Sequence, residues 1–471
     1  MKKNNLTQGS IVGSLLALSI PIVLANLLQT AYQLIDTFWV GRLGAVAVAA
    51  VSLSFPIIFL MIALGGGLSI AGSILVAQYK GRNDLRNVDF VSGQTIIMVL
   101  IVSAILSVVG YFSSEPILKL MGAAPDVLSS ATSYMQISFI GLIFFFGFFV
   151  FQALMRGVGD VKTPVFIVLA TVILNLFLDP MFIFGFGPIP ALGVAGAAWA
   201  TIGTQGIASV VGLLILFSGK YGIRLKKNDL KPNLGIITKM FRLGFPASVD
   251  QSTRALGLTV MTILAASFGT TIVASYGIGI RILSFVIIPA IGLSMATSTL
   301  VGQNMGAGKI ERAEKIAHIS NIIGFVVLTI VGILFFIFAT SIVAAFIPNN
   351  AAVISESAIF VKIMALTFGF MGVQMVVSGV FSGAGATLTS MVITIVSLWV
   401  LRFPIAYVLS SNTLLGVKGI WWAFPITNIL AAGIAQIWFM RGTWKKKKII
   451  DETQKMQSQI EREEVIGEAA N

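Results

Sequence analysis

The chain has 471 residues, of which 57% are hydrophobic and only 10% are charged, and its mean hydropathy is +0.97. A soluble domain usually has about 25% charged residues, so most of the outer surface of this chain must face lipid. The single histidine and the absence of cysteine exclude disulfides, thiolate or histidine-cluster metal sites and histidine-based catalytic triads.

Apolar stretches recur along the chain, and each is at least as long as the roughly 20 residues that a helix needs to cross a bilayer. Each stretch ends at glycine, proline, asparagine or a cluster of charges. We therefore expect an all-α integral membrane protein of twelve transmembrane helices. In chain order the expected helices are 12–40, 45–77, 89–111, 128–153, 161–184, 191–218, 236–268, 271–302, 314–340, 352–382, 387–410 and 415–441.

The basic residues indicate how these helices are oriented. With twelve helices, 24 of the 31 Lys and Arg residues fall on one side of the membrane, four lie within helices, and the other side holds only Arg42, Lys119 and Lys418. Positive loops mark the cytoplasmic side, so we expect a multi-pass protein of the cell membrane with both termini in the cytoplasm. This topology explains the net charge of +13, and we expect no nucleic-acid partner.

The two halves of the chain resemble each other in sequence. A shift of 225 residues aligns Pro21 with Pro246, and it aligns the segment from Gly67 to Gly81 with the segment that begins at Gly292. The repeat unit contains six helices. Because six is even, the halves are parallel repeats, which in transporters form two lobes around a central cavity.

We divide the chain accordingly into four parts, with a basic cytoplasmic linker between the lobes. These are an N-lobe at 1–218, the linker at 219–235, a C-lobe at 236–441 and a charged cytoplasmic tail at 442–471.

Three of the eighteen acidic residues lie well inside predicted helices: Asp36, Asp179 and Asp250. A charge at the bilayer centre costs about 2.5–3.5 kcal/mol on insertion scales, so such an acid needs a partner, water or a proton. Asp36, Asp179 with Asn175 one turn before it, and Thr201 reach a similar depth in the outer half of the N-lobe. We predict a cation or proton site there, and hard oxygen ligands of this kind also suit Na⁺.

Further polar residues extend this site along the first helix. Asn26, Gln29, Gln33 and Asp36 share one helical face, and Tyr32 borders it. We assign these residues, together with Tyr134, to the cavity. The alternative for single amides or hydroxyls is that they hydrogen-bond neighbouring helices.

Asp250 precedes Arg254 by one helical turn. This spacing predicts an ion pair within the helix, whose role is either self-neutralisation or contact with substrate or coupling ion. Under the repeat, Asp36 aligns with Met261, so the two lobes do not share an acid position. Three further cations lie within predicted helices, either paired or reaching the membrane surface: Arg281, Lys362 and Arg402.

Four segments resemble the MATE family of multidrug and toxin extruders, in its prokaryotic DinF-like branch. They are the helix from Pro21 to Asp36, Val76-x-Gln78-x-x-Gly81, Arg156-Gly157-Val158-Gly159-Asp160-x-x-Thr163-Pro164 and Asn175-x-x-x-Asp179-Pro180. The resemblance covers roughly 10–440. It implies that Asp36, Asn175, Asp179 and Thr201 form the coupling-ion site, that Gln29 and Tyr32 line the cavity, and that Pro21 is a bend in the first helix.

These observations predict an antiporter that exports bulky, often cationic organic compounds against H⁺ or Na⁺, works as a monomer and needs no cofactor. The alternative is a flippase for lipid-linked precursors on a related scaffold, to which Arg254, Arg281 and Arg402 would give a cationic cavity. A third hypothesis, an intramembrane enzyme, has no serine–base pair or histidine metal cluster to support it, so we expect no enzyme activity.

Overall fold

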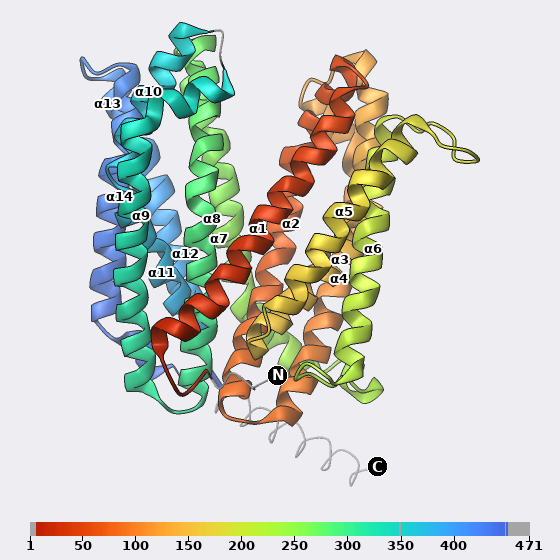
Figure 1. The fold of residues 1–471 in the computed structure, drawn as a ribbon, viewed down its shortest axis with the longest axis vertical. Coiled ribbons are helices and arrows are strands. Elements are labelled where there is room, and N and C mark those ends of the chain that lie inside the picture. Colours follow the sequence, from red (N-terminus) through yellow and green to blue (C-terminus); the bar gives the residue numbers. More distant parts are fainter. Residues whose placement is uncertain (1–5, 348–349, 448, 451–471) are drawn as a thin grey trace. The chain divides into compact units, whose positions relative to one another are not determined.

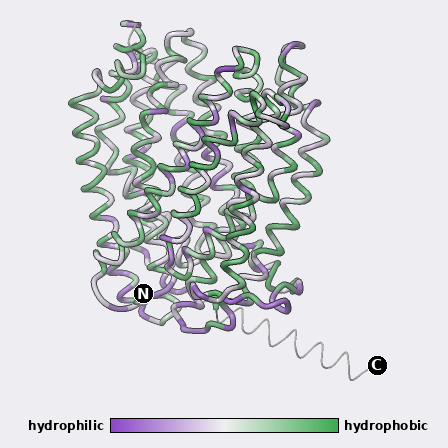
Figure 2. Tube along the Cα trace, turned by 45° about the vertical axis from the view of Figure 1, so that its right-hand side comes forward, coloured by the Kyte–Doolittle hydropathy of each residue, from purple (hydrophilic) through white to green (hydrophobic). Residues whose placement is uncertain are grey.

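The computed structural model describes residues 6–347, 350–447 and 449–450. Helices make up almost all of this part of the chain (Figure 1). Ten of them are long and apolar enough to cross a membrane, and a bent helix pair makes an eleventh. Apolar residues predominate along the helices, and hydrophilic residues gather in the loops (Figure 2). The all-α, multi-pass membrane class predicted from the sequence is therefore confirmed.

The total of twelve predicted spans depends on α7 (Leu234–Ala266). This helix has 33 residues but is not among the apolar spans just counted. Its sequence contains Lys239, Arg242, Asp250 and Arg254, and these charges lower its hydropathy. The length of α7 still exceeds the roughly 20 residues needed to span a bilayer.

The helix boundaries repeat as the sequence predicts. Helix α2 (Ala45–Gly81) and helix α8 (Thr270–Gly306) both have 37 residues, and adding 225 to the bounds of α2 gives those of α8. Each helix begins after a glycine with positive φ, Gly44 at 101° and Gly269 at 102°. Glycine adopts this backbone conformation readily because it has no Cβ, so the same turn recurs in both halves.

The chain forms two compact packing units. One unit comprises Leu24–Ser248 with residues 449–450, and the other comprises residues 6–23 with Val249–Lys447. Helix α1 (Ile11–Gly41) is therefore shared between the units, and so is α7. Packing units need not follow repeat boundaries, and the predicted limits of the lobes, linker and tail stay predictions. The tail beyond residue 450 lies outside the described residues.

Helices α1 and α7 are divided just after a proline. Pro21 lies inside α1, three residues before Leu24, and Pro246 lies inside α7, three residues before Val249. A proline inside a helix removes one backbone hydrogen bond and disfavours straight continuation. This location fits the bend predicted at Pro21, which stays a prediction.

The unit around Leu24–Ser248, called here the N-lobe unit, packs its long helices closely. Glycine allows part of this packing: a Cβ on Gly72 would collide with the Thr95 side chain. Small residues let helix backbones approach in membranes, where no hydrophobic effect drives helices together. Besides the shared helices it contains α2, α3 (Leu85–Leu120), α4 (Pro125–Val158), α5 (Lys162–Phe184), α6 (Val194–Ser218) and the 3₁₀ turn η1 (Lys227–Leu230).

The second unit, called here the C-lobe unit, has two irregular spans. The pair α10 and α11 bends by 56°, and a π-helical segment, η2, separates α12 from α13. Its elements besides the shared helices are α8, α9 (Ile310–Phe346), α10 (Ala351–Ala365), α11 (Phe368–Ala384), α12 (Thr387–Ile395), η2 (Val396–Arg402), α13 (Phe403–Ser411), α14 (Val417–Met440) and the 3₁₀ turn η3 (Thr443–Lys446).

The linker turn η1 is held against α3 by one buried amide. The Gln94 side chain donates to the carbonyls of Asp229, at 2.9 Å, and Lys231, at 2.7 Å, and it accepts from the Asn233 amide at 2.8 Å. Asp229 is fully buried and pairs with Arg86. The linker is thus a docked segment of the N-lobe unit and not a free tether.

We expect Gln94→Leu to release this linker. The substitution removes three hydrogen bonds worth roughly 0.5–1.5 kcal/mol each, and it leaves backbone groups unpaired. Limited trypsin digestion of inside-out vesicles should then cut after Lys226 or Lys227 several-fold faster than in the wild-type protein. Gln136→Leu, an amide-to-leucine change on α4, is the control and should digest like wild type. Equal digestion of all three proteins would contradict the prediction.

Candidate functional site

The two acids predicted to act together lie in the N-lobe unit, Asp36 on α1 and Asp179 on α5. They are close enough for their charges to interact. Asn175 donates from Nδ2 to Asp179 Oδ1 at 2.7 Å, and both residues are fully buried. The i, i+4 spacing of Asn175 and Asp179 on one helix produces this contact.

Three oxygens at this site lack hydrogen-bond partners within the described part of the chain. They are Asp36 Oδ1, Asp179 Oδ2 and Asn175 Oδ1, and all three atoms are buried. A buried polar atom without a partner costs about 1–3 kcal/mol, and more when it is charged. A proton on a carboxylate, or a cation that accepts oxygen ligands, would remove that cost. The site is thus chemically suited to H⁺ or Na⁺.

A hydroxyl pair lies near the two acids, because Tyr32 is close enough to interact electrostatically with Asp36 and Asp179. The phenol of Tyr32 and the hydroxyl of Thr204 share a hydrogen bond of 2.6 Å, and Thr204 also donates to the Thr201 carbonyl at 2.9 Å. Thr201 was predicted from the sequence, whereas Thr204 was not. The missed signal is its spacing, because Thr204 lies one helical turn after Thr201 on α6 and therefore shares its face.

The remaining predicted cavity residues differ in their surroundings. Tyr134 on α4 lies close enough to interact electrostatically with Asp36, Tyr32 and Asp179. Asn26 and Gln29 are half-buried, while Gln33 is exposed. The structure therefore brings Tyr134 and Tyr32 to the acids, and it leaves Gln33 at the surface of its packing unit.

The predicted pair in the C-lobe unit forms, and it has further partners. Arg254 Nε donates to Asp250 Oδ1 at 3.0 Å, and Arg254 Nη2 donates to Thr394 Oγ1 at 2.8 Å. Ser390 donates to the second oxygen of Asp250 at 3.2 Å. The pair thus connects α7 to α12, a contact that the sequence spacing could not reveal.

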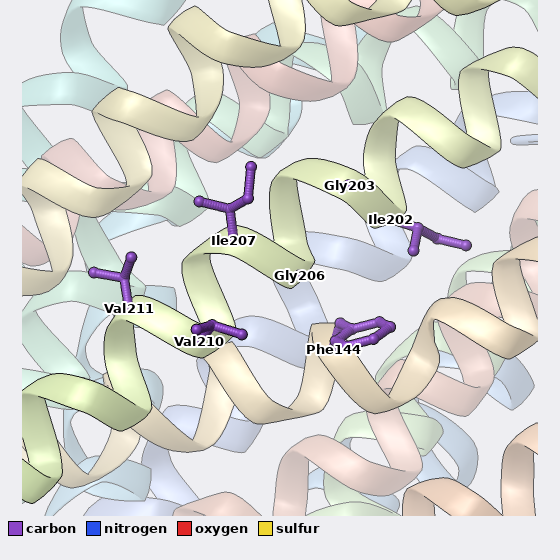
Figure 3. A pocket seen from close by; sticks show the side chains of 7 residues that line it. All are labelled: Phe144, Ile202, Gly203, Gly206, Ile207, Val210 and Val211. Carbon is purple, nitrogen blue, oxygen red and sulfur yellow. The ribbon is translucent and has the colours of Figure 1, made fainter.

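A groove on the N-lobe unit is entirely apolar. It has a volume of about 390 Å³ and lies between α4 and α6 (Figure 3), where its lining carries no polar side chain. Such a surface offers no polar ligand to an ion, so it does not qualify as the coupling site. The lining residues are Phe144, Ile202, Gly203, Gly206, Ile207, Val210 and Val211.

Comparison with known proteins connects this fold to one family. The MatE family model matches residues 21–181 and 246–408, and these segments begin at the two equivalent prolines. The chain is 30% identical to the probable multidrug resistance protein YpnP of Bacillus subtilis (strain 168), with 96% of this chain and 100% of the relative covered. The probable multidrug resistance protein YoeA of the same organism is 29% identical, with 91% and 93% covered.

A solved structure agrees with the sequence relatives. It is the outward-facing conformation of a multidrug resistance MATE family transporter of the MOP superfamily, and it superposes with a TM-score of 0.88 at 27% identity, covering 95% of this chain and 99% of the other. This chain belongs to the MatE family, a family of membrane transporters. The family and the fold class predicted from the sequence are therefore both confirmed.

Proposed function

We propose that the protein is a secondary active multidrug exporter that exchanges organic compounds, often cationic, for H⁺ or Na⁺. The observation that carries the proposal is the cluster of buried, unpartnered oxygens on Asp36, Asp179 and Asn175 in a chain of the MatE family. Its relatives are named for multidrug resistance. These names do not favour the flippase alternative. Because the chain belongs to a transporter family, the proposal assigns it no enzyme activity.

In this mechanism the coupling ion neutralises repelling carboxylates. With no proton or cation bound, Asp36 and Asp179 repel each other, and each has an unpaired buried oxygen. An ion drives a conformational change only if it binds one state more tightly than the other. We infer that binding at these two acids favours one access state of the lobes, with Pro21 as the bend in α1 and Gln29, Asn26, Gln33, Tyr32 and Tyr134 facing the cavity.

The remaining assignments complete the proposal. Asp250 and Arg254 bind substrate or stabilise the C-lobe, and the transporter works as a monomer without a cofactor. It lies in the cell membrane with both termini cytoplasmic, because most basic residues then face the cytoplasm. Its partners are small organic substrates and the lipid bilayer, with no nucleic acid.

Separate ion gradients test the proposal. Purified protein in proteoliposomes loaded with a fluorescent organic cation such as ethidium should release it when either an inward Na⁺ gradient or an inward pH gradient is imposed. The gradient that works identifies the coupling ion. Release that is identical with and without gradients, or no release with either, would refute ion-coupled export of this cation.

A further inference from the structure

Arg402 in the C-lobe unit is an intramembrane guanidinium without an acidic partner among the described residues. Its Nε donates to Thr427 Oγ1 at 3.1 Å, and its Nη2 donates to Asn428 Oδ1 at 2.7 Å. The acceptors are neutral, and the other charged side chain with which Arg402 interacts is Arg254, of the same sign. Arginine near a bilayer centre costs about 2.5–3.5 kcal/mol on insertion scales, and no carboxylate in the described part of the chain offsets this cost.

Aromatic side chains lie near the guanidinium. The Arg402 Cζ lies over the ring of Phe424, 4.8 Å from the ring centroid. Tyr276 is near enough to interact with Arg402 electrostatically and stacks on Trp421 at 6.3 Å. Tyr276 Oη and Trp421 Nε1 are both buried without hydrogen-bond partners in the described chain, and these side chains are 2% and 0% exposed. The cation Arg402 therefore lies near Tyr276, whose hydroxyl has no partner in the described chain, and Tyr276 stacks on Trp421.

Two features of Arg402 favour a ligand over a purely structural role: its unused N–H donors and its place in a π-helical segment. A guanidinium has five N–H groups, and the two bonds above use one on Nε and one on Nη2. Arg402 ends the π-helical segment η2, and π-helical turns within α-helices are frequent at functional sites. Arginine recognises carboxylate and phosphate groups through paired N–H donors.

The internal repeat relates this cluster to residues that lie beside the N-lobe acids. Thr204 and Thr427 each lie eleven residues after the glycine that precedes α6 or α14, Gly193 or Gly416. Thr204 binds Tyr32 beside the two acids, whereas Thr427 binds Arg402.

The residues on the preceding spans agree with this equivalence. Asn175 follows Gly159 by sixteen residues, and Arg402 follows Gly385 by seventeen. Gly159 and Gly385 are equivalent in the repeat, because each is the second glycine of a Gly-x-Gly segment, and both end a helix in the left-handed conformation, at φ 90° and 80°. Arg402 thus lies within one residue of the position equivalent to Asn175, which is the hydrogen-bond partner of Asp179.

We propose that the Arg402 cluster is a second binding site, which takes the carboxylate or phosphate of an organic anion whose aromatic part packs against Phe424. The group could belong to a soluble aromatic anion or to a lipid headgroup, since both offer the same oxygens. The inference deepens the proposed export function, which would then extend to anionic or zwitterionic compounds. Binding itself needs no ion gradient, so it can be measured whether or not export occurs.

The test is equilibrium dialysis of radiolabelled 2-naphthoate against the protein in phosphatidylcholine nanodiscs, with empty nanodiscs subtracted. We expect Arg402→Gln to raise the Kd for 2-naphthoate at least about tenfold, because a hydrogen bond to a charged group is worth about 1.5–3 kcal/mol. The neutral isostere 2-naphthamide should bind both proteins equally. Arg281→Gln removes an exposed cation from α8 and should leave the Kd unchanged.

Two further arms complete the test. Arg402→Lys keeps the charge but loses the planar pair of N–H donors, so we expect a smaller rise in the Kd for 2-naphthoate. This variant replaces Arg402→Gln in the test if Arg402→Gln does not fold. Adding phosphatidylglycerol should weaken 2-naphthoate binding more in the wild type than in Arg402→Lys if a lipid headgroup is the ligand, and equally in both if a soluble anion is. A wild-type Kd in both Arg402 variants, or an equal loss in Arg281→Gln, would overturn the proposal.

Discussion

Asp36→Asn should abolish ion-driven efflux while the protein still inserts into the membrane. The asparagine keeps the size of the side chain but can neither take up a proton nor contribute a negative charge to a cation. Because the carboxylate of Asp36 interacts with Asp179 and has a buried oxygen without a partner, removing its charge leaves the site permanently close to its neutralised form. We expect efflux to fall by at least one to two orders of magnitude.

The measurement is ethidium release from proteoliposomes under the gradient that drives the wild-type protein. Asp126→Asn is the matched control, because Asp126 is an exposed acid in the first turn of α4 in the same unit, and it should transport normally. The amount of reconstituted protein and its elution on size exclusion must match wild type. Normal gradient-driven efflux by Asp36→Asn would exclude Asp36 as a coupling residue.

Asp250→Asn should destabilise the C-lobe unit, and the double variant Asp250→Asn with Arg254→Gln should recover most of the loss. Removing only the acid leaves Arg254 without its ion pair inside the membrane, and breaking a buried pair this way costs about 3–5 kcal/mol. Arg254 is partly exposed and keeps its bond to Thr394, so we expect the lower end of that range. The neutral double variant has no unpaired charge.

Melting temperatures in detergent measure the loss of stability in Asp250→Asn and its recovery in the double variant. Efflux measurements then test whether the pair takes part in transport. If Asp250 and Arg254 only neutralise each other, the double variant should be stable and transport like wild type. If they contact substrate or coupling ion, the double variant should be stable but transport poorly. Equal melting temperatures for the single variant and the wild type would show that the pair contributes nothing to stability.

Much of the architecture was predictable from the sequence because the bilayer restricts the choices. Each span must satisfy its backbone hydrogen bonds internally, so long apolar stretches of this length are helices. The repeat that aligns Pro21 with Pro246 then divides the helices into two parallel halves of six. The predicted ends of the helices were approximate, since apolar composition changes gradually at the membrane surface. Helix α2, for example, continues to Gly81, whereas the apolar stretch was predicted to end at residue 77.

The polar residues of the N-lobe site were also visible in the sequence. An acid within an apolar helix is costly, so Asp36 and Asp179 stood out without any structure. Their i, i+4 neighbour Asn175 followed from helical geometry alone. Likewise, the Asp250–Arg254 pair was predicted by spacing and is present at 3.0 Å.

Only the tertiary structure decided which helices these residues meet. The bond between Tyr32 and Thr204, the link from Arg254 to Thr394, and the two neutral acceptors of Arg402 each join residues from different helices. Helical periodicity assigns a residue to a face of its own helix, but the rotation and partners of that helix depend on packing across the whole unit. The sequence by itself therefore determined the membrane class, the repeat and the intramembrane acids, while the pairing of Arg402 with neutral groups could be seen only in the folded protein.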